Sequence, residues 1–511
     1  MAGKSIPIEV VAEGGNSLYA SERKVYPRDI DGRYQRLRKL AVFVLLGLFY
    51  GMPWLHWGGR QAVLFDLPAR KFYVLGVVFW PQDFVFLAML LMIAGFALFF
   101  FSALAGRLWC GYACPQTVWT EVFLRIEHWC EGDRAQRMRL DAAPWSAGKA
   151  WRKGSKHLLW LLLALWTGFT FVGFFTPIAE LAARAPLHWS GWEAFWIFFY
   201  ALATWGNAGF LREQVCKYMC PYARFQGAMF DRDTLIIAYD PMRGEPRGPR
   251  RRGLASVLER ARGLLGVEQA YDYAARAAHA SRLDAAGTTA IVDRAASVQP
   301  LPKFAAEELG DCIDCTICVQ VCPTGIDIRN GLQYECIACG ACIDACDDVM
   351  GKLGYPQGLI RHTTQNAVDG RPTRVVRPRM VVYALLLVAM LVGWGWGVSH
   401  RSPLIAEVLR DRNALYRALP NGGSENDYSL KIVNKSDRAQ HYRITLRGDA
   451  GIALTTTSTE VAARAEEVLT VPLTAAAGAA VHGRHEVQFV VGARDGSASA
   501  VVKSTYFGPP P

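Results

Sequence analysis

Eight cysteines in the middle of the chain fall into two runs with the same spacing. The runs are Cys312, Cys315, Cys318, Cys322 and Cys336, Cys339, Cys342, Cys346. This C-x2-C-x2-C-x3-C spacing is typical of bacterial ferredoxins, in which three thiolates of one loop hold a 4Fe-4S cube and the fourth crosses to the other cube. The pattern therefore predicts two 4Fe-4S clusters and the movement of single electrons.

The crossover rule assigns the last cysteine of each run to the cluster of the other run. The ligands of the first cluster are then predicted to be Cys312, Cys315, Cys318 and Cys346. Those of the second cluster are predicted to be Cys336, Cys339, Cys342 and Cys322. A structural zinc site is the alternative, but zinc pairs two separated C-x2-C knuckles and does not need the third and fourth cysteine of each run.

Two further cysteine motifs occur earlier in the chain, each after an apolar stretch. They are Cys110-Gly-Tyr-Ala-Cys114-Pro115 and Cys216-Lys-Tyr-Met-Cys220-Pro221. Cysteines four residues apart share one face of a helical turn, so two such turns side by side would present four thiols. Four soft thiols suit Cu(I), another iron-sulfur centre or a thiol–disulfide couple. The alternative is that these cysteines are inert, buried apolar side chains.

We take Cys110, Cys114, Cys216 and Cys220 as candidate ligands of a soft metal centre or members of a thiol–disulfide couple. Tyr112 and Met219, inside the motifs, are expected to pack rather than to bind metal. Cys130 has no partner motif and is expected to be a structural thiol. Haem is not expected, because the candidate histidines do not form matched pairs on facing spans; they are His56, His128, His157 and His188.

Apolar stretches must position these motifs. The chain is 52% hydrophobic with 16 Trp and 25 Phe, which is high for a soluble protein. Most of the stretches approach the ~20 residues that a bilayer requires, and the first is the shortest. They predict about five membrane-spanning helices, with buried core helices as the alternative; the stretches are Leu40–Leu55, Phe84–Ala105, Leu158–Phe175, Trp192–Leu211 and Met380–Val398.

Lysine and arginine set the expected orientation of these spans. They are frequent before Leu40 and between Gly106 and Lys156, so both segments should be cytoplasmic. The segment between the third and fourth spans carries only Arg184, and is expected on the outer side. The net charge of +11 is thus mainly a topology signal, and no nucleic-acid partner is expected. No cleavable signal peptide is evident in the first 39 residues.

The rest of the chain is expected to form separate parts. From about Asn421, short runs of alternating apolar residues between turn signals predict an all-β sandwich. The predicted order is a basic N-terminal arm (1–39), a four-span membrane domain (40–239), an arginine-rich linker (240–310), a 2[4Fe-4S] ferredoxin domain (311–355), a linker (356–379), a fifth span (380–398) and the sandwich (420–511).

Three stretches resemble the CcoG family, also called FixG or RdxA. They are Trp109–Phe123, Cys216–Gln226 and Cys312–Arg329. The resemblance implies a polytopic α-helical membrane protein with about five spans, a bacterial-type 2[4Fe-4S] ferredoxin module and a C-terminal immunoglobulin-like β-sandwich. Residues 254–298 look like an insertion relative to the family, so no role is transferred to them.

The same resemblance implies that the protein reduces Cu(II) to Cu(I) during assembly of cbb3-type cytochrome c oxidase in the bacterial inner membrane. The candidate catalytic and copper-binding residues are then Cys110, Cys114, Cys216 and Cys220. Expected cofactors and partners are two 4Fe-4S clusters, copper as substrate or bound ion, membrane lipid, oxidase assembly factors or copper chaperones, and an unidentified cytoplasmic electron donor. The ferredoxin module would be cytoplasmic and the C-terminal domain periplasmic. The alternatives are a NapH-like quinol dehydrogenase and a non-catalytic, copper-binding assembly scaffold.

Overall fold

The computed structural model describes residues 24–248, 309–411, 414–436, 438–448, 451–456 and 459–510. The chain divides into two compact units. One comprises Met1–Pro81 with Leu91–Val388, and the other comprises Gln82–Leu90 with Ala389–Pro511. The predicted insertion at 254–298 lies outside the described residues.

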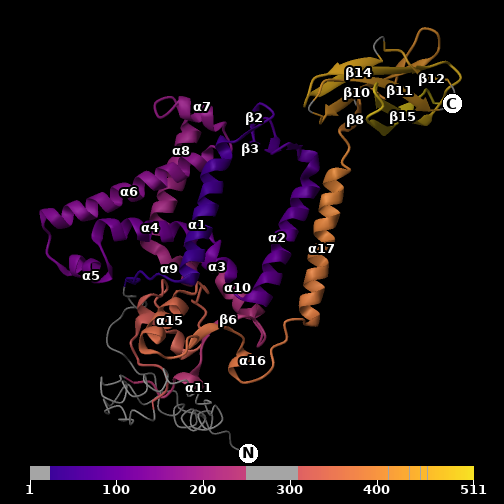
Figure 1. Ribbon diagram of the computed structural model, residues 1–511. Coiled ribbons are helices and arrows are strands. Elements are labelled where there is room, and N and C mark those ends of the chain that lie inside the picture. The colour runs from indigo at the N-terminus through magenta and orange to yellow at the C-terminus, as the bar shows by residue number, and fades with distance from the viewer. Residues whose placement is uncertain are drawn as a thin grey trace, which may run out of the picture. The chain divides into compact units, whose positions relative to one another are not determined.

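Five helices are long and apolar enough to cross a membrane, as the sequence predicts. They are Arg33–Trp54, Pro81–Ala105, Ala147–Val172, Gly191–Met219 and Pro378–Ser399. The first is longer than its apolar stretch because a basic turn at Arg33–Lys39 joins the same helix. Figure 1 shows these helices as α1 (Arg33–Gly51), α2 (Phe84–Ala105), α6 (Ala147–Val172), α8 (Gly191–Thr204) and α17 (Pro378–Ser399).

The fourth span does not remain a regular α-helix. After α8 it continues as the π-helical segment η3 (Trp205–Leu211), the short α9 (Arg212–Gln214) and the π-helical turn η4 (Val215–Met219). Arg212, at the end of η3, has a φ of 37°, a conformation that non-glycine residues rarely adopt. Such π-helical departures are frequent at functional sites, and here they place Cys216.

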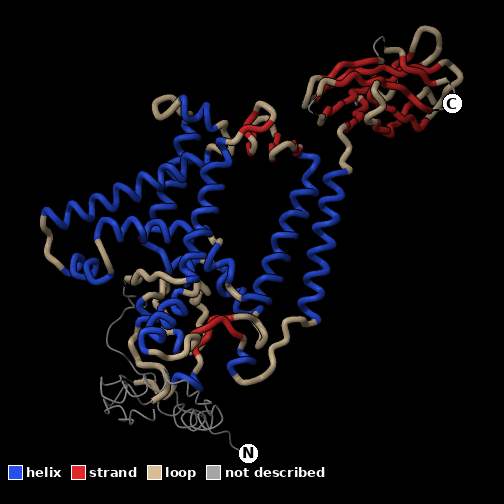
Figure 2. Tube along the Cα trace, in the orientation of Figure 1, coloured by secondary structure: helices blue, strands red, loops and turns tan. Residues whose placement is uncertain are grey.

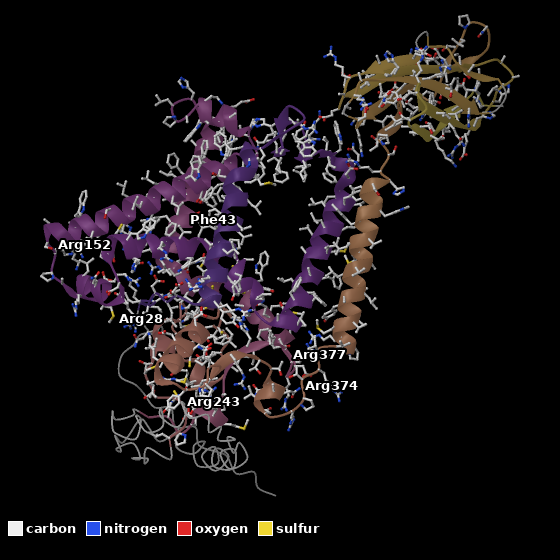
Figure 3. The ribbon with its side chains drawn as sticks, viewed as in Figure 1. Arg28, Phe43, Arg152, Arg243, Arg374 and Arg377 are labelled. Carbon is white, nitrogen blue, oxygen red and sulfur yellow. The ribbon has the colours of Figure 1, made fainter. Side chains whose placement is uncertain are left out.

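Shorter elements connect the spans of the first unit (Figure 2). Its remaining helices are α3 (Leu108–Tyr112), α4 (Pro115–Glu131), α5 (Arg134–Ala142), α7 (Ile178–Ala183), α10 (Pro221–Met229) and α11 (Pro241–Gly244), with the 3-10 turns η1 (Met52–Trp54) and η2 (Pro81–Asp83). Its small strands before α2 are β1 (His56–Trp57), β2 (Arg60–Gln61), β3 (Val63–Asp66), β4 (Lys71–Val74) and β5 (Val77–Phe79). Phe43 on α1 (Figure 3) is 78% exposed, as expected for a side chain that faces lipid.

The ferredoxin region is built from short elements around an apolar core. They are α14 (Ile317–Gln320), η5 (Ile328–Asn330), α15 (Ala341–Leu353) and α16 (Gln365–Val368), with β6 (Ile236–Tyr239) paired antiparallel to β7 (Ile360–Thr363). Ile237, Ile343 and Met350 are buried in this core. Strand β6 follows the fourth span, so the strand pair joins the ferredoxin region to the end of the membrane helices (Figure 1).

In the second unit, two antiparallel sheets form a sandwich. Their strand orders are β12-β14-β10-β8, with β9 also on β10, and β13-β11-β15-β16. The strands are β8 (Leu404–Arg410), β9 (Arg417–Ala418), β10 (Ser424–Asn434), β11 (Gln440–Gly448), β12 (Ile452–Leu454), β13 (Glu460–Ala463), β14 (Val468–Ala477), β15 (Arg484–Ala493) and β16 (Ser499–Phe507). Alternate residues such as Leu430, Ile444 and Phe489 are buried between the sheets. The sandwich begins at Leu404, before the predicted boundary at residue 420, because β8 pairs with β10.

Candidate functional site

The first predicted ligand set surrounds one cavity in the ferredoxin region. Cys312, Cys315, Cys318 and Cys346 all line it, together with apolar residues that include Met350 and Ile360. Thr316 has a φ of 58°, so the loop turns sharply between Cys315 and Cys318. Cys346 comes from α15, a separate element, which is how the last cysteine of the second run reaches the first loop.

The second predicted ligand set surrounds a neighbouring cavity. Its lining includes Cys322, Cys336, Cys339 and Cys342, with isoleucines such as Ile326 and Ile337. Cys318, of the first ligand set, lines both cavities. Four thiols and an apolar wall suit a 4Fe-4S cube, since each iron takes one thiolate and the wall excludes water. The assignment of individual ligands stays a prediction, which this arrangement supports.

Burial controls the charge of the cluster thiols. It raises the pKa of Cys336 and of Cys346 to about 12, and neighbouring thiols add to the rise. Burial also raises the pKa of Cys318 to about 11, although the nearby Arg329 guanidinium opposes this effect. Without metal these groups are therefore neutral thiols, so binding of iron must displace their protons.

The four cysteines of the C-x3-C-P motifs, which we call the four-thiol site, lie at helix ends. Cys110 is in the short α3, and Cys216 is in the π-helical turn η4. Cys114 and Cys220 are the N-terminal capping residues of α4 and α10. Each pair therefore spans the end of one helical segment and the cap of the next, and does not lie on one continuous α-helical turn. The proline after each pair occupies the first position of the next helix, where its missing N–H costs nothing.

The structure brings the two pairs together. Cys110 and Cys216 pack against the same apolar cluster, which contains Ile337 and Cys339. Burial raises the pKa of the Cys110 thiol to about 12, and the charges of Cys114, Cys216 and Cys220 act on it as well. Among the described residues, however, no three His, Cys, Asp or Glu side chains converge closely enough to hold one metal ion. In this arrangement a single copper ion would be held by at most two of the thiols.

Helix α3 contacts the loop of the second cluster cavity directly. A Cβ atom added to Gly111 would lie 2.8 Å from the carbonyl oxygen of Ile337 and 2.9 Å from that of Ala338. The Tyr112 hydroxyl donates to the Cys339 carbonyl at 3.4 Å. Only glycine at position 111 allows this approach, which places the four-thiol site beside the second cavity.

Arginine 107 also ties the membrane helices to this loop. Its guanidinium is buried and donates to the carbonyl oxygens of Tyr334, Cys336 and Ala223. These bonds join α10, which follows the second thiol pair, to the loop that carries the second ligand set. The three acceptors are backbone carbonyls, so the charge of Arg107 is available to stabilise negative charge nearby.

Two glutamines beside the thiols were not singled out from the sequence. Gln226 is fully buried, accepts from the Cys110 thiol at 3.4 Å and donates to Ser102 at 3.3 Å. Gln116 donates to the carbonyl oxygens of Asn207 and Arg212, at 2.8 and 3.1 Å. Their signal in the sequence is a glutamine in each helix that begins at the proline of a C-x3-C-P motif.

The remaining candidates occupy other positions. Tyr112 packs on the ferredoxin region, as expected, whereas Met219 is 60% exposed and does not pack in a core. Cys130 is half-buried against the apolar cluster around Phe123.

Three protein families match parts of the chain. A 4Fe-4S dicluster domain matches residues 211–263 and 271–365, and a 4Fe-4S binding domain matches residues 86–132. The immunoglobulin-like fold at the C-terminus of FixG matches residues 394–509. Both C-x3-C-P motifs thus fall inside matches to iron-sulfur families. The predicted fold class, with its ferredoxin and immunoglobulin-like parts and about five candidate membrane helices, is confirmed.

Curated relatives extend over most of the chain. The nitrogen fixation protein FixG of Rhizobium meliloti is 36% identical over 474 residues, which cover 84% of this chain and 80% of the relative. Protein RdxA of Cereibacter sphaeroides is 35% identical over 452 residues, which cover 85% and 84%. A crystal structure of a FixG-related protein from Vibrio parahaemolyticus is 26% identical and covers 21% of this chain and 97% of that chain, with a TM-score of 0.20. The chain therefore belongs to the FixG/RdxA family of membrane iron-sulfur proteins.

Proposed function

We propose that this protein reduces Cu(II) to Cu(I) at the four-thiol site, for copper-site assembly of cbb3-type cytochrome c oxidase. The observation that carries the proposal is the contact between α3 and the loop of the second cluster cavity, at Gly111 and Tyr112. It sets Cys110 and Cys216 on the apolar cluster that also contains the predicted ligand Cys339. The four-thiol site and the predicted second cluster would therefore share one apolar cluster of side chains.

The chemistry of the residues supports electron transfer from the clusters to copper. Two 4Fe-4S clusters supply electrons one at a time, which is what reduction of Cu(II) requires. Soft thiolates bind Cu(I) more strongly than oxygen or nitrogen ligands do, so Cys110 and its partners would stabilise the product. A copper chaperone or an oxidase assembly factor would then remove the reduced ion.

The proposed setting is the bacterial inner membrane. The ferredoxin region would be cytoplasmic and the immunoglobulin-like domain periplasmic. An odd number of spans, such as the five candidate helices, would put the two ends on opposite sides, and the lysine and arginine distribution supports the proposed orientation. A cytoplasmic ferredoxin region would keep its thiols in a reducing compartment.

Anaerobic reduction of Cu(II) by the purified, cluster-loaded protein tests the proposal, after its clusters have been reduced with dithionite and the excess dithionite removed. The variant has Cys110, Cys114, Cys216 and Cys220 all changed to serine, and its iron content must equal that of the native chain. Cys130→Ser is the matched control, because this thiol lies outside both motifs. We expect reduction by the native and control proteins and its loss in the fourfold variant.

Equal rates in all three proteins would overturn the site assignment. Stoichiometric copper binding without turnover in the native protein would instead indicate an assembly scaffold. Because the iron content is matched, neither result can be attributed to a loss of clusters.

A further inference from the structure

A cavity of about 270 Å³ lies beside the irregular part of the fourth span. Its lining comes from α6, η3 and α9 and from the described start of the N-terminal arm. The lining residues include Lys156, His157, Trp160, Phe210 and Arg212. None of them belongs to the four-thiol site or to the predicted cluster ligands.

Aromatic rings form one side of this cavity. His157 stacks on Phe210 with ring centroids 5.7 Å apart and an interplanar angle of 17°. Trp160 is 1% exposed and meets His157 edge-on at 5.2 Å. Such a wall can accommodate a ligand with a flat ring, because aromatic rings prefer stacked and edge-to-face contacts.

Two polar atoms in the cavity lining are buried and have no hydrogen-bond partner among the described residues. They are Nη1 of Arg212 and Nδ1 of His157. Arg212 is only 7% exposed, and its other nitrogens are used: Nε donates to the Gly209 carbonyl and Nη2 to Glu127. A buried donor without a partner costs free energy, so Nη1 favours a ligand with an acceptor oxygen.

The cations around the cavity are already paired with carboxylates. Lys156 lies 2.8 Å from Glu131, and Lys24 lies 2.9 Å from Asp141. Arg212 is paired with the fully buried Glu127. An anionic ligand, such as a lipid phosphate, would find these charges largely neutralised. A neutral ring with polar oxygens fits the lining better.

The cavity is bordered by apolar side chains that face outwards. Phe210, which lines it, is 56% exposed, and its neighbour Leu211 is 37% exposed. Leu158, next to His157 in α6, is 59% exposed. These residues belong to helices that can span the membrane, so a ligand with a hydrocarbon tail could enter from the lipid.

The cavity and the four-thiol site share one segment of backbone. Arg212 and Gln214 line the cavity, and the same segment continues into the turn that holds Cys216. Gln116, next to the Cys114-Pro115 pair, donates to the Arg212 carbonyl. A redox-active ligand in the cavity would thus lie close to the proposed electron-transfer route.

We propose that this cavity binds the headgroup of a membrane quinone, with Arg212 Nη1 donating to one ring oxygen and His157 Nδ1 pairing with a hydroxyl of the quinol. Oxidation of one quinol to the quinone releases two electrons and two protons. Two 4Fe-4S clusters can accept one electron each, His157 Nδ1 takes the first proton, and the second passes to water. The electron donor is then lipid-borne, not the cytoplasmic donor expected from the family. The proposal does not depend on copper as the final acceptor.

Binding of a short-chain quinone to the cluster-loaded chain in nanodiscs tests this site, with quenching of tryptophan fluorescence as the readout. We expect saturable quenching by the native protein. Phe210→Ala and His157→Phe should each weaken it about tenfold, which corresponds to the loss of one hydrogen bond or ring contact. His157→Gln keeps a hydrogen-bonding side chain and should recover part of the affinity. Phe199→Ala changes a similarly exposed residue outside the cavity and should have no effect.

Reduction by the matching quinol, followed through the cluster absorbance without copper, gives a second readout. Reduction of the clusters by quinol should be slower in Phe210→Ala and His157→Phe than in the native protein. Reduction of the clusters by dithionite should be equally fast in all three. Non-saturable quenching, or equal binding by all variants, would overturn the proposal. So would displacement of the quinone by phosphatidylglycerol at low concentration, since this would identify a lipid headgroup site. A failure to reduce copper would leave these results unchanged, so the two proposals can fail separately.

Discussion

At the scale of single residues, Gly111 sets the distance between the four-thiol site and the second cluster cavity. We predict that Gly111→Ala destabilises the protein by about 1–3 kcal/mol, because a Cβ would lie within 3 Å of two backbone carbonyl oxygens. Copper reduction should slow while the iron content is retained. Thermal unfolding and single-turnover kinetics check this. Gly227→Ala in α10 is the control, since a Cβ there meets nothing within 4 Å; an equal loss in both variants would contradict the prediction.

The predicted crossover of cluster ligands can be tested at the same scale. Each cavity is lined by the first three cysteines of one run and by the last cysteine of the other run. Cys322→Ser should remove the same cluster as Cys336→Ser, although Cys322 belongs to the first run. Cys346→Ser should resemble Cys312→Ser. Iron content should fall by about half in each variant, and electron paramagnetic resonance of the reduced proteins distinguishes the two clusters. Matching spectra for Cys322→Ser and Cys312→Ser would rule out the crossover.

At the scale of elements, the N-terminal end of α1 is hydrogen-bonded to the ferredoxin region. The Asp344 carboxylate of α15 accepts from the backbone N–H groups of Tyr34 and Gln35 at 3.2 and 2.8 Å, in the first turn of α1. A carboxylate satisfies two free donors there and interacts favourably with the helix dipole. A distant element thus caps the first membrane helix, in the place where a local side chain usually does so.

Removal of this cap should destabilise the contact between α1 and α15. We predict that Asp344→Ala lowers the free energy of unfolding by about 1–2 kcal/mol. Asp348→Ala, on the same helix, removes only an exposed pair with Lys352 and should cost less than about 0.5 kcal/mol. Denaturant titration of both variants in the same detergent measures the difference. Equal effects would mean that the cap does not hold the first span.

At the scale of the whole molecule, the proposed orientation can be tested by labelling. Val501, in β16, is 55% exposed and belongs to the part expected in the periplasm. Val376, before α17, is 79% exposed and is expected on the cytoplasmic side near Arg374 and Arg377 (Figure 3). A membrane-impermeant maleimide should label Val501→Cys in intact spheroplasts, but Val376→Cys only after lysis. Labelling of the parent chain measures the background signal from its own 13 cysteines. The reverse pattern would invert the topology.

Much of this protein is determined by local features of the sequence. Apolar length and charge predict five spans, because a bilayer demands both from any segment that crosses it. The alternation of apolar residues predicts the sandwich, since successive residues of a strand face opposite sides. The cysteine spacing predicts two clusters and even their crossover, because cluster geometry restricts how a short loop can supply three ligands.

Contacts between distant segments were decided only in the tertiary structure. No local pattern shows that Gly111 packs against the backbone of Ile337, or that Asp344 caps α1. Nor does one show that Gln226 accepts a hydrogen bond from the Cys110 thiol. The cysteine spacing also does not reveal that Cys216 lies in a π-helical turn. Each of these features depends on how closely two elements pack, and packing is a property of the assembled chain. The spacing of cysteines therefore specifies the chemistry, whereas the packing of α3 on the cluster loop specifies where that chemistry meets the membrane helices.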